Sequence, residues 1–88
     1  MIRTNLKYIL EEREISIREL ERRTGERYET LRRMANNKLT QFPNMTLFRV
    51  CSVLNIEIGD LLYVDYKHHE ADVTDNYNYS NKYEKNKR

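Results

Sequence analysis

The strongest constraint on the fold lies in residues 16–38, where a single glycine separates two short amphipathic segments. Ser16 and Glu19 have the S-x-x-E spacing of a capping box, in which each side chain accepts a hydrogen bond from the other residue's backbone amide. Gly25 follows the first segment, and glycine ends a helix in the left-handed conformation without steric cost. A second segment, about residues 28–36, begins almost at once. The pattern predicts two short helices joined by a tight turn.

Apolar spacing predicts three more helices around this pair. Residues spaced four, three and one apart predict a first helix over about residues 3–13. After the pair, Asn44 is suited to cap a helix over about residues 45–54, because Asn is a favoured N-cap residue. A short last helix is expected over about residues 58–62. The sequence therefore predicts an all-α, compact five-helix domain in residues 1–65.

The composition changes after Val64, where apolar periodicity ends and Asn, Tyr, Lys and Asp predominate. Residues 66–88 are expected to form a flexible polar tail, of which only the last part is basic. Three tyrosines of this tail are suited to stack on bases or to pack on a partner, although a solvated tail is the simpler interpretation. They are Tyr77, Tyr79 and Tyr83.

Positive charge is concentrated in residues 16–38, which hold seven bases against four acids although the whole chain has a net charge of only +2. Such a basic face suits a polyanion. The single cysteine cannot form an internal disulfide, and the apolar runs are far shorter than the roughly 20 residues that span a bilayer. We therefore expect a cytoplasmic protein without a membrane segment or an export signal.

No residue pattern points to catalysis. His68 and His69 are adjacent and lack further ligands at metal spacing, and Cys51 lies on the inward stripe of its helix. Neither Gly25 nor Gly59 belongs to a phosphate-binding loop. We expect no enzymatic activity, no metal and no cofactor.

The second helix of the pair is expected to expose more of its residues than stability alone would favour. At about 100° per residue, Leu31 and Met34 point inward together. A merely solvated face is the simpler alternative, but the outward residues combine arginines, a tyrosine and an acid, as a binding face does. These residues are Tyr28, Glu29, Arg32, Arg33 and Asn36.

Residues 1 to about 64 resemble the phage-repressor-like, or Xre/Cro-like, helix-turn-helix family. The resemblance rests on ISIRELERRTG at residues 15–25, TLRRMANNK at residues 30–38 and LNIEIGDLL at residues 54–62. In such proteins the second helix of the motif lies in the DNA major groove, and the domain usually binds as a dimer. The resemblance implies a sequence-specific DNA-binding regulator, a repressor of bacterial, phage or mobile-element type.

The family's functional positions can be carried over residue by residue. Arginine suits guanine O6 and N7, and glutamate suits the amino group of cytosine. The implied base-reading residues are Arg27, Tyr28, Glu29, Arg32 and Arg33. The implied phosphate-contacting residues are Arg18, Asn36, Asn37 and Lys38.

Three positions depart from the family's pattern. Glu21 stands where a small residue is usual, Glu26 where an apolar residue is usual, and Arg27 where Ser or Thr caps the helix. Each carboxylate needs a partner, for which Arg22 and Arg27 are the obvious candidates. Paired carboxylates favour DNA as the partner, whereas unpaired ones favour a protein-binding module such as an antitoxin, an anti-repressor or a modulator. RNA binding is a third interpretation, but no aromatic stacking platform is evident.

A homodimer is expected from the mechanism of this family. The sequence holds one apolar run that a small core does not obviously absorb, and we place the self-association surface there. It comprises Leu61, Leu62, Tyr63, Val64 and Tyr66.

Overall fold

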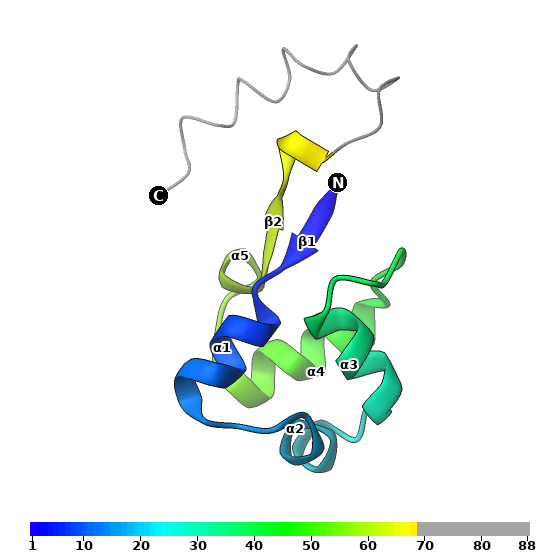
Figure 1. Ribbon diagram of the computed structural model, residues 1–88. Helices are drawn as coiled ribbons and strands as arrows, with labels where there is room; N and C mark the ends of the chain where they lie inside the picture. The colour runs from blue at the N-terminus through cyan, green and yellow to red at the C-terminus, as the bar shows by residue number, and fades with distance from the viewer. Residues whose placement is uncertain (69–88) are drawn as a thin grey trace.

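A computed structural model describes residues 1–68, and shows five helices and a small sheet (Figure 1). The elements are β1 (Ile2–Thr4), α1 (Leu6–Arg13), α2 (Ile17–Thr24), α3 (Tyr28–Ala35), α4 (Asn44–Leu54), α5 (Ile58–Leu61), β2 (Leu62–Val64) and a 3-10 helix (Tyr66–His68). The predicted five-helix domain is confirmed. Most of the predicted tail, residues 69–88 with its three tyrosines, lies outside the described residues.

The two-stranded sheet corrects the expected start of the first helix. β1 pairs with β2 in antiparallel register, with Arg3 opposite Tyr63. Helix α1 therefore begins at Leu6 and not near residue 3. Local spacing cannot reveal this strand, because its partner lies at the other end of the domain. In Figure 1 the sheet projects from the end of the helical body opposite α2.

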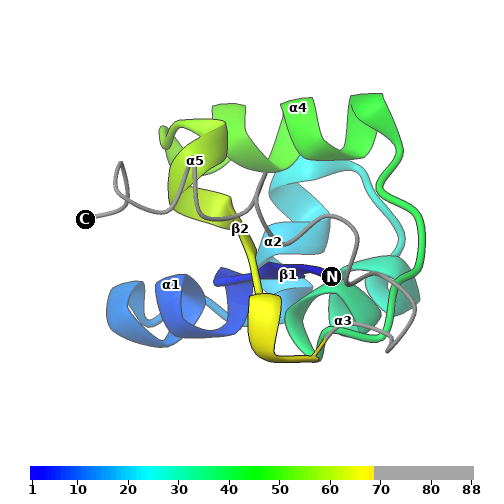
Figure 2. The same ribbon diagram turned by 90° about the horizontal axis from the view of Figure 1, so that it is seen from above.

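The core is a single small cluster between the helices. Helix α2 buries only Leu20 and lies against both α3 and α4. Figure 2 shows α4 along one side of the domain and α1 and α3 along the other. The buried apolar residues are Leu6, Leu10, Leu20, Leu31, Met34, Ala35, Val50, Leu54 and Leu61. Because Leu61 belongs to this core, it does not form part of the self-association surface expected from the sequence.

The ends of α2 are set largely as predicted. Gly25 has a φ of +80° and ends the helix, and the Ser16 hydroxyl accepts a hydrogen bond from the Glu19 amide at 3.0 Å. The reciprocal half of the expected capping box is wrong. The Glu19 carboxylate binds Arg22 and Arg23 instead, at 2.7 Å from Arg23. Two guanidinium donors within one helical turn form stronger, charge-assisted bonds than a backbone amide.

Asparagines end the next two long helices. Asn37 and Asn55 have φ values of 58° and 55°, the left-handed conformation in which asparagine, after glycine, most often ends a helix. The prediction that Asn44 caps α4 is wrong, because Asn44 is the first residue of that helix and Pro43 occupies the cap position. None of the helices within residues 1–68 is long and apolar enough to cross a membrane.

Candidate nucleic-acid interface

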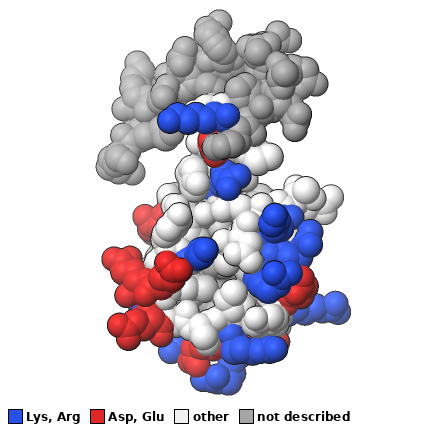
Figure 3. Space-filling model, in the orientation of Figure 1, with Lys and Arg blue, Asp and Glu red and all other residues white. Residues whose placement is uncertain are grey.

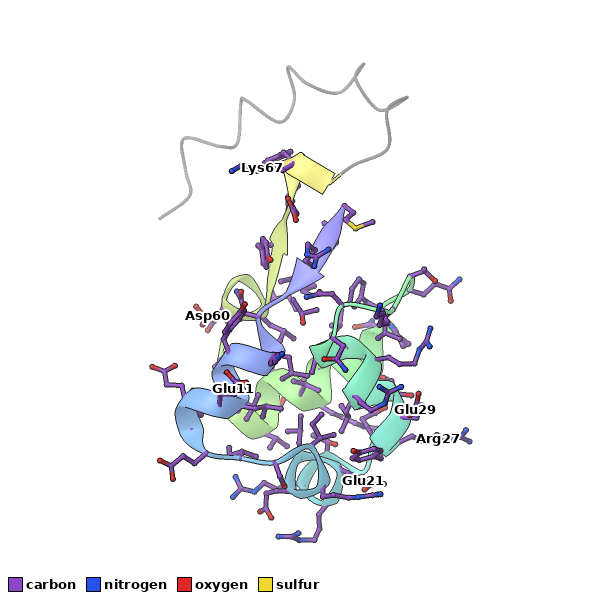
Figure 4. All side chains as sticks on the ribbon, viewed as in Figure 1. Glu11, Glu21, Arg27, Glu29, Asp60 and Lys67 are labelled. Carbon is purple, nitrogen blue, oxygen red and sulfur yellow. The ribbon has the colours of Figure 1, made fainter. Side chains whose placement is uncertain are left out.

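Helix α3 divides into a buried and an outward side, as its periodicity predicts. Leu31 and Met34 are fully buried. On the opposite side, Glu29 and Arg33 are exposed, and Arg27, which precedes the first residue of the helix, is exposed as well. Figure 4 shows Arg27 and Glu29 pointing away from the helical body. The helix thus presents charged side chains to any surface that approaches from outside.

Two of the expected base-reading residues bind each other. Arg32 donates from Nε and Nη2 to the two carboxylate oxygens of Glu29, at 3.0 Å and 2.6 Å. The bonds from Arg32 lower the pKa of Glu29, and the carboxylate raises the pKa of Arg32. This bidentate geometry holds a planar guanidinium and a carboxylate side by side on the helix surface.

Arg18 connects the two helices of the motif. Its guanidinium lies 3.9 Å from the centre of the Tyr28 ring, a cation–π contact between α2 and α3. Its Nη1 is also 3.2 Å from Oε1 of Glu21. The partner of Glu21 is therefore Arg18, one helical turn away, and not the candidates expected from the sequence.

Glu26 in the turn is bound by two residues of α4 that the sequence analysis missed. Its carboxylate accepts hydrogen bonds from Thr46 Oγ1 at 2.9 Å and from Arg49 Nη1 at 2.7 Å. The bond from Arg49 lowers the pKa of Glu26, against the opposing effect of burial. The sequence offers one signal for this contact, the polar residue Thr46, which is buried on the inward side of α4. These contacts hold the turn of the motif against α4.

The loop after α3 has both structural and exposed residues. The Asn37 side chain accepts from the Thr4 amide at 2.7 Å and donates to the Thr4 carbonyl at 3.5 Å. Its amide therefore occupies the outer edge of β1 as a neighbouring strand would. Asn36 and Lys38 are exposed, and the Lys38 carbonyl accepts from Arg33 Nη2 at 3.2 Å.

Charge is distributed unevenly over the domain. In Figure 3, Lys and Arg side chains gather over α3 and α2, whereas Asp and Glu side chains gather over the side formed by α1. The exposed acids of α1 and its end include Glu11, Glu12 and Glu14. Residues 1–68 contain no group of three or more His, Cys, Asp or Glu placed to hold a metal ion. On the face that Figure 3 shows, a polyanion would meet more favourable charge on the side of α2 and α3 than on the side of α1.

The family model of the Cro/C1-type HTH DNA-binding domain matches residues 5–66. The chain belongs to this family. It is also similar to the crystal structure of a proposed DNA-binding protein from Bacteroides fragilis, with 27% identity and a TM-score of 0.63. That match covers 72% of this chain and 100% of the other. No curated protein matches the sequence.

Within this Cro/C1-type domain, the expected DNA-contacting residues fall into two groups. The side chain of Arg27 has no ion-pair or hydrogen-bond partner within residues 1–68, and Asn36 and Lys38 are exposed. The other side chains are engaged by protein groups: Arg18 with Tyr28, Glu29 with Arg32, Arg33 with the Lys38 carbonyl and Asn37 with Thr4. Sequence periodicity indicated which residues share the face, but not that they bind one another.

Proposed function

We propose that this protein is a sequence-specific transcriptional regulator, a repressor that occupies an operator with α3 in the major groove. The observation that carries the proposal is the outward face of α3, where Arg33 and the Glu29–Arg32 pair lie opposite the buried side and the exposed Arg27 precedes the helix. This face lies in a domain of a DNA-binding family. No enzymatic activity, metal or cofactor is part of the proposal.

The roles of the residues follow from their chemistry. Arg27 and Arg33 suit guanine edges, and the carboxylate of Glu29 suits a cytosine amino group beside a contact made by Arg32. Asn36 and Lys38 suit the phosphates that border the groove. We do not assign a phosphate contact to Asn37, because its side chain is hydrogen-bonded to Thr4 and holds the loop to β1.

The paired carboxylates support DNA as the partner over another protein. Three acids on or beside this surface would favour a protein-binding module if they were unpaired, and each of them has an arginine partner: Glu21, Glu26 and Glu29. Their negative charges are therefore compensated within the domain, which reduces their repulsion of phosphates.

We also propose that the regulator acts as a homodimer that joins through β2. The backbone N–H and C=O groups of Tyr63 face β1. Because these groups alternate in direction along a strand, those of Leu62 and Val64 face away from β1. The outer edge of β1 is closed by the Asn37 amide, whereas the outer edge of β2 carries no third strand within residues 1–68. Tyr63 and Val64 of β2 are each 37% exposed, and Ile2, which lies opposite Val64 on β1, is 45% exposed.

Selection of bound sequences from a random DNA pool tests the function. The expected result is a defined site whose affinity, followed by fluorescence anisotropy, falls steeply with salt. Salt-insensitive or absent DNA binding, with a stable complex to another protein, would favour the protein-binding module.

Sedimentation with and without the selected DNA tests the dimer. Val64→Lys should shift the equilibrium toward monomer, because a charge on the edge of β2 opposes strand pairing. Tyr8→Lys is the matched control, since Tyr8 is an exposed apolar residue of α1, away from the sheet. A wild-type monomer under both conditions would remove the dimer from the proposal.

A further inference from the structure

We propose that Arg18 is a positioning residue for base recognition, which holds Tyr28 in the orientation that meets DNA. This inference rests on the proposed function and assigns Arg18 a role different from the phosphate contact expected at its position. It also makes Tyr28 a determinant of sequence preference that depends on a residue of the other helix.

The geometry places Arg18 between two partners. Its guanidinium covers one face of the Tyr28 ring at 3.9 Å, while its Nη1 lies 3.2 Å from Glu21 Oε1. Arg18 and Glu21 lie on α2, and Tyr28 is the first residue of α3. Contacts with the carboxylate and with the ring therefore restrict the same guanidinium. A side chain restricted in this way limits the motion of the ring on which it stacks.

The stack also determines which part of Tyr28 is available. The face of the ring that Arg18 covers cannot pack on a thymine methyl group, which leaves the hydroxyl, the ring edge and the other face to meet DNA. A hydroxyl donates and accepts hydrogen bonds at base edges and phosphates alike. Its direction therefore decides whether the contact distinguishes between bases.

The charge of Arg18 supports this role over a phosphate contact. Because Glu21 compensates that charge, Arg18 adds little net attraction for the DNA backbone. Each uncompensated base that neutralises a phosphate changes the slope of log affinity against log salt by about 0.9. A positioning residue should leave this slope unchanged and alter sequence preference instead.

Arg18→Lys separates the two roles, because lysine keeps the positive charge but lacks the planar group that stacks on an aromatic ring. Arg22→Lys is the matched control, since Arg22 is an equally exposed arginine of α2 that pairs with Glu19 on the same helix. Both proteins and Tyr28→Phe are to be measured against every single-base variant of the selected site, and at several salt concentrations.

The expected result is a loss of discrimination of roughly two- to five-fold in Arg18→Lys, at the base pair that Tyr28→Phe also affects. The salt slope should match that of the wild type, and Arg22→Lys should change neither quantity. A wild-type preference in Arg18→Lys would overturn the proposal, whatever the slope. A wild type that selects no DNA site would overturn the proposed function itself, which distinguishes the two failures.

The amide and ring signals of Tyr28 in the unbound protein provide a measurement independent of DNA. Arg18→Lys should shift these NMR signals while leaving the thermal unfolding midpoint close to that of Arg22→Lys. Unshifted Tyr28 signals would show that the stack does not restrain the ring, and would also overturn the proposal.

Discussion

The carboxylate of Glu26, in the turn of the motif, is held by Arg49 of α4 with Oε2 and Nη1 2.7 Å apart. Only 12% of the Glu26 side chain is exposed. The contact joins the turn to a helix that no local pattern connects with it. It restrains the start of α3, because the turn leads through Arg27 into the first residue of that helix.

Glu26→Gln is expected to lower the free energy of unfolding by about 1–2 kcal/mol at neutral pH, because a charge-assisted bond becomes a neutral one. Urea denaturation measures the difference. Glu12→Gln, at an exposed position of α1, is the matched control and should have little effect. Equal effects of the two substitutions would mean that the contact with Arg49 adds no stability.

The same contact predicts a pH dependence. The pKa of Glu26 is lowered from its ordinary value of 4.5 in the folded protein. As pH falls, the unfolded chain binds this proton first, so the stabilisation is complete above about pH 4.5 and disappears as pH falls through the folded-state pKa. The stability difference between wild type and Glu26→Gln should therefore shrink in acid. A difference that grows on acidification would contradict the assignment.

Thr4 offers a second test of stability. Its hydroxyl is buried, donates to the Met34 carbonyl at 2.9 Å and accepts from the Leu6 amide at 3.3 Å. Thr4→Val would leave both backbone groups without this partner, at an expected cost of about 1–3 kcal/mol in urea denaturation. Thr4→Ser keeps the hydroxyl and should cost less. If valine proved less harmful than serine, packing of the methyl group would dominate at this site.

Glu29→Gln tests the paired face of α3. The substitution frees the guanidinium of Arg32, which can then neutralise a phosphate, so the salt slope should steepen by about 0.9 and affinity for random DNA should rise. Preference for the selected site should fall. Glu11→Gln removes the same charge on the side of α1, far from α3, and controls for a general change in charge. Identical slopes for the two variants would refute a local role.

Arg33 and Lys38 should differ in the kind of binding energy that they supply. Arg33→Ala should relax base preference at one position, by about 1–3 kcal/mol of discrimination. Lys38→Ala should weaken all sequences alike. Because Arg33 also donates to the Lys38 carbonyl, the structure of the loop in Arg33→Ala is to be checked by NMR. Retained affinity and base preference in Arg33→Ala would contradict the placement of α3 in the major groove.

The sequence contained enough information to predict the five helices, since their apolar stripes and the glycine that ends α2 are local signals. Leu31, Met34 and Gly25 lie as their spacing required. The pairing of Ile2 with Val64 was out of reach, because each strand has only three residues and no hairpin turn connects them.

The contacts within the candidate site show the same limit. The helical periodicity placed Glu29 and Arg32 on one face. Long side chains have many rotamers, however, and spacing cannot select the rotamers that pair these two residues. The partner of Glu26 was assigned to its sequence neighbourhood, whereas Arg49 reaches it from α4. Sequence proximity favoured the wrong arginines in both this case and that of Glu21.

The sheet has a further consequence for the order of folding events. The contacts between α2 and α3 close short loops, whereas pairing β1 with β2 closes nearly the whole domain. We expect the larger loss of chain entropy to delay the pairing of the strands. In hydrogen exchange, the amides of Asn5 and Asp65, which bond to Leu61 and Met1, should exchange before that of Leu31 in α3. Helix α3 would then remain folded during openings that release both ends of the domain.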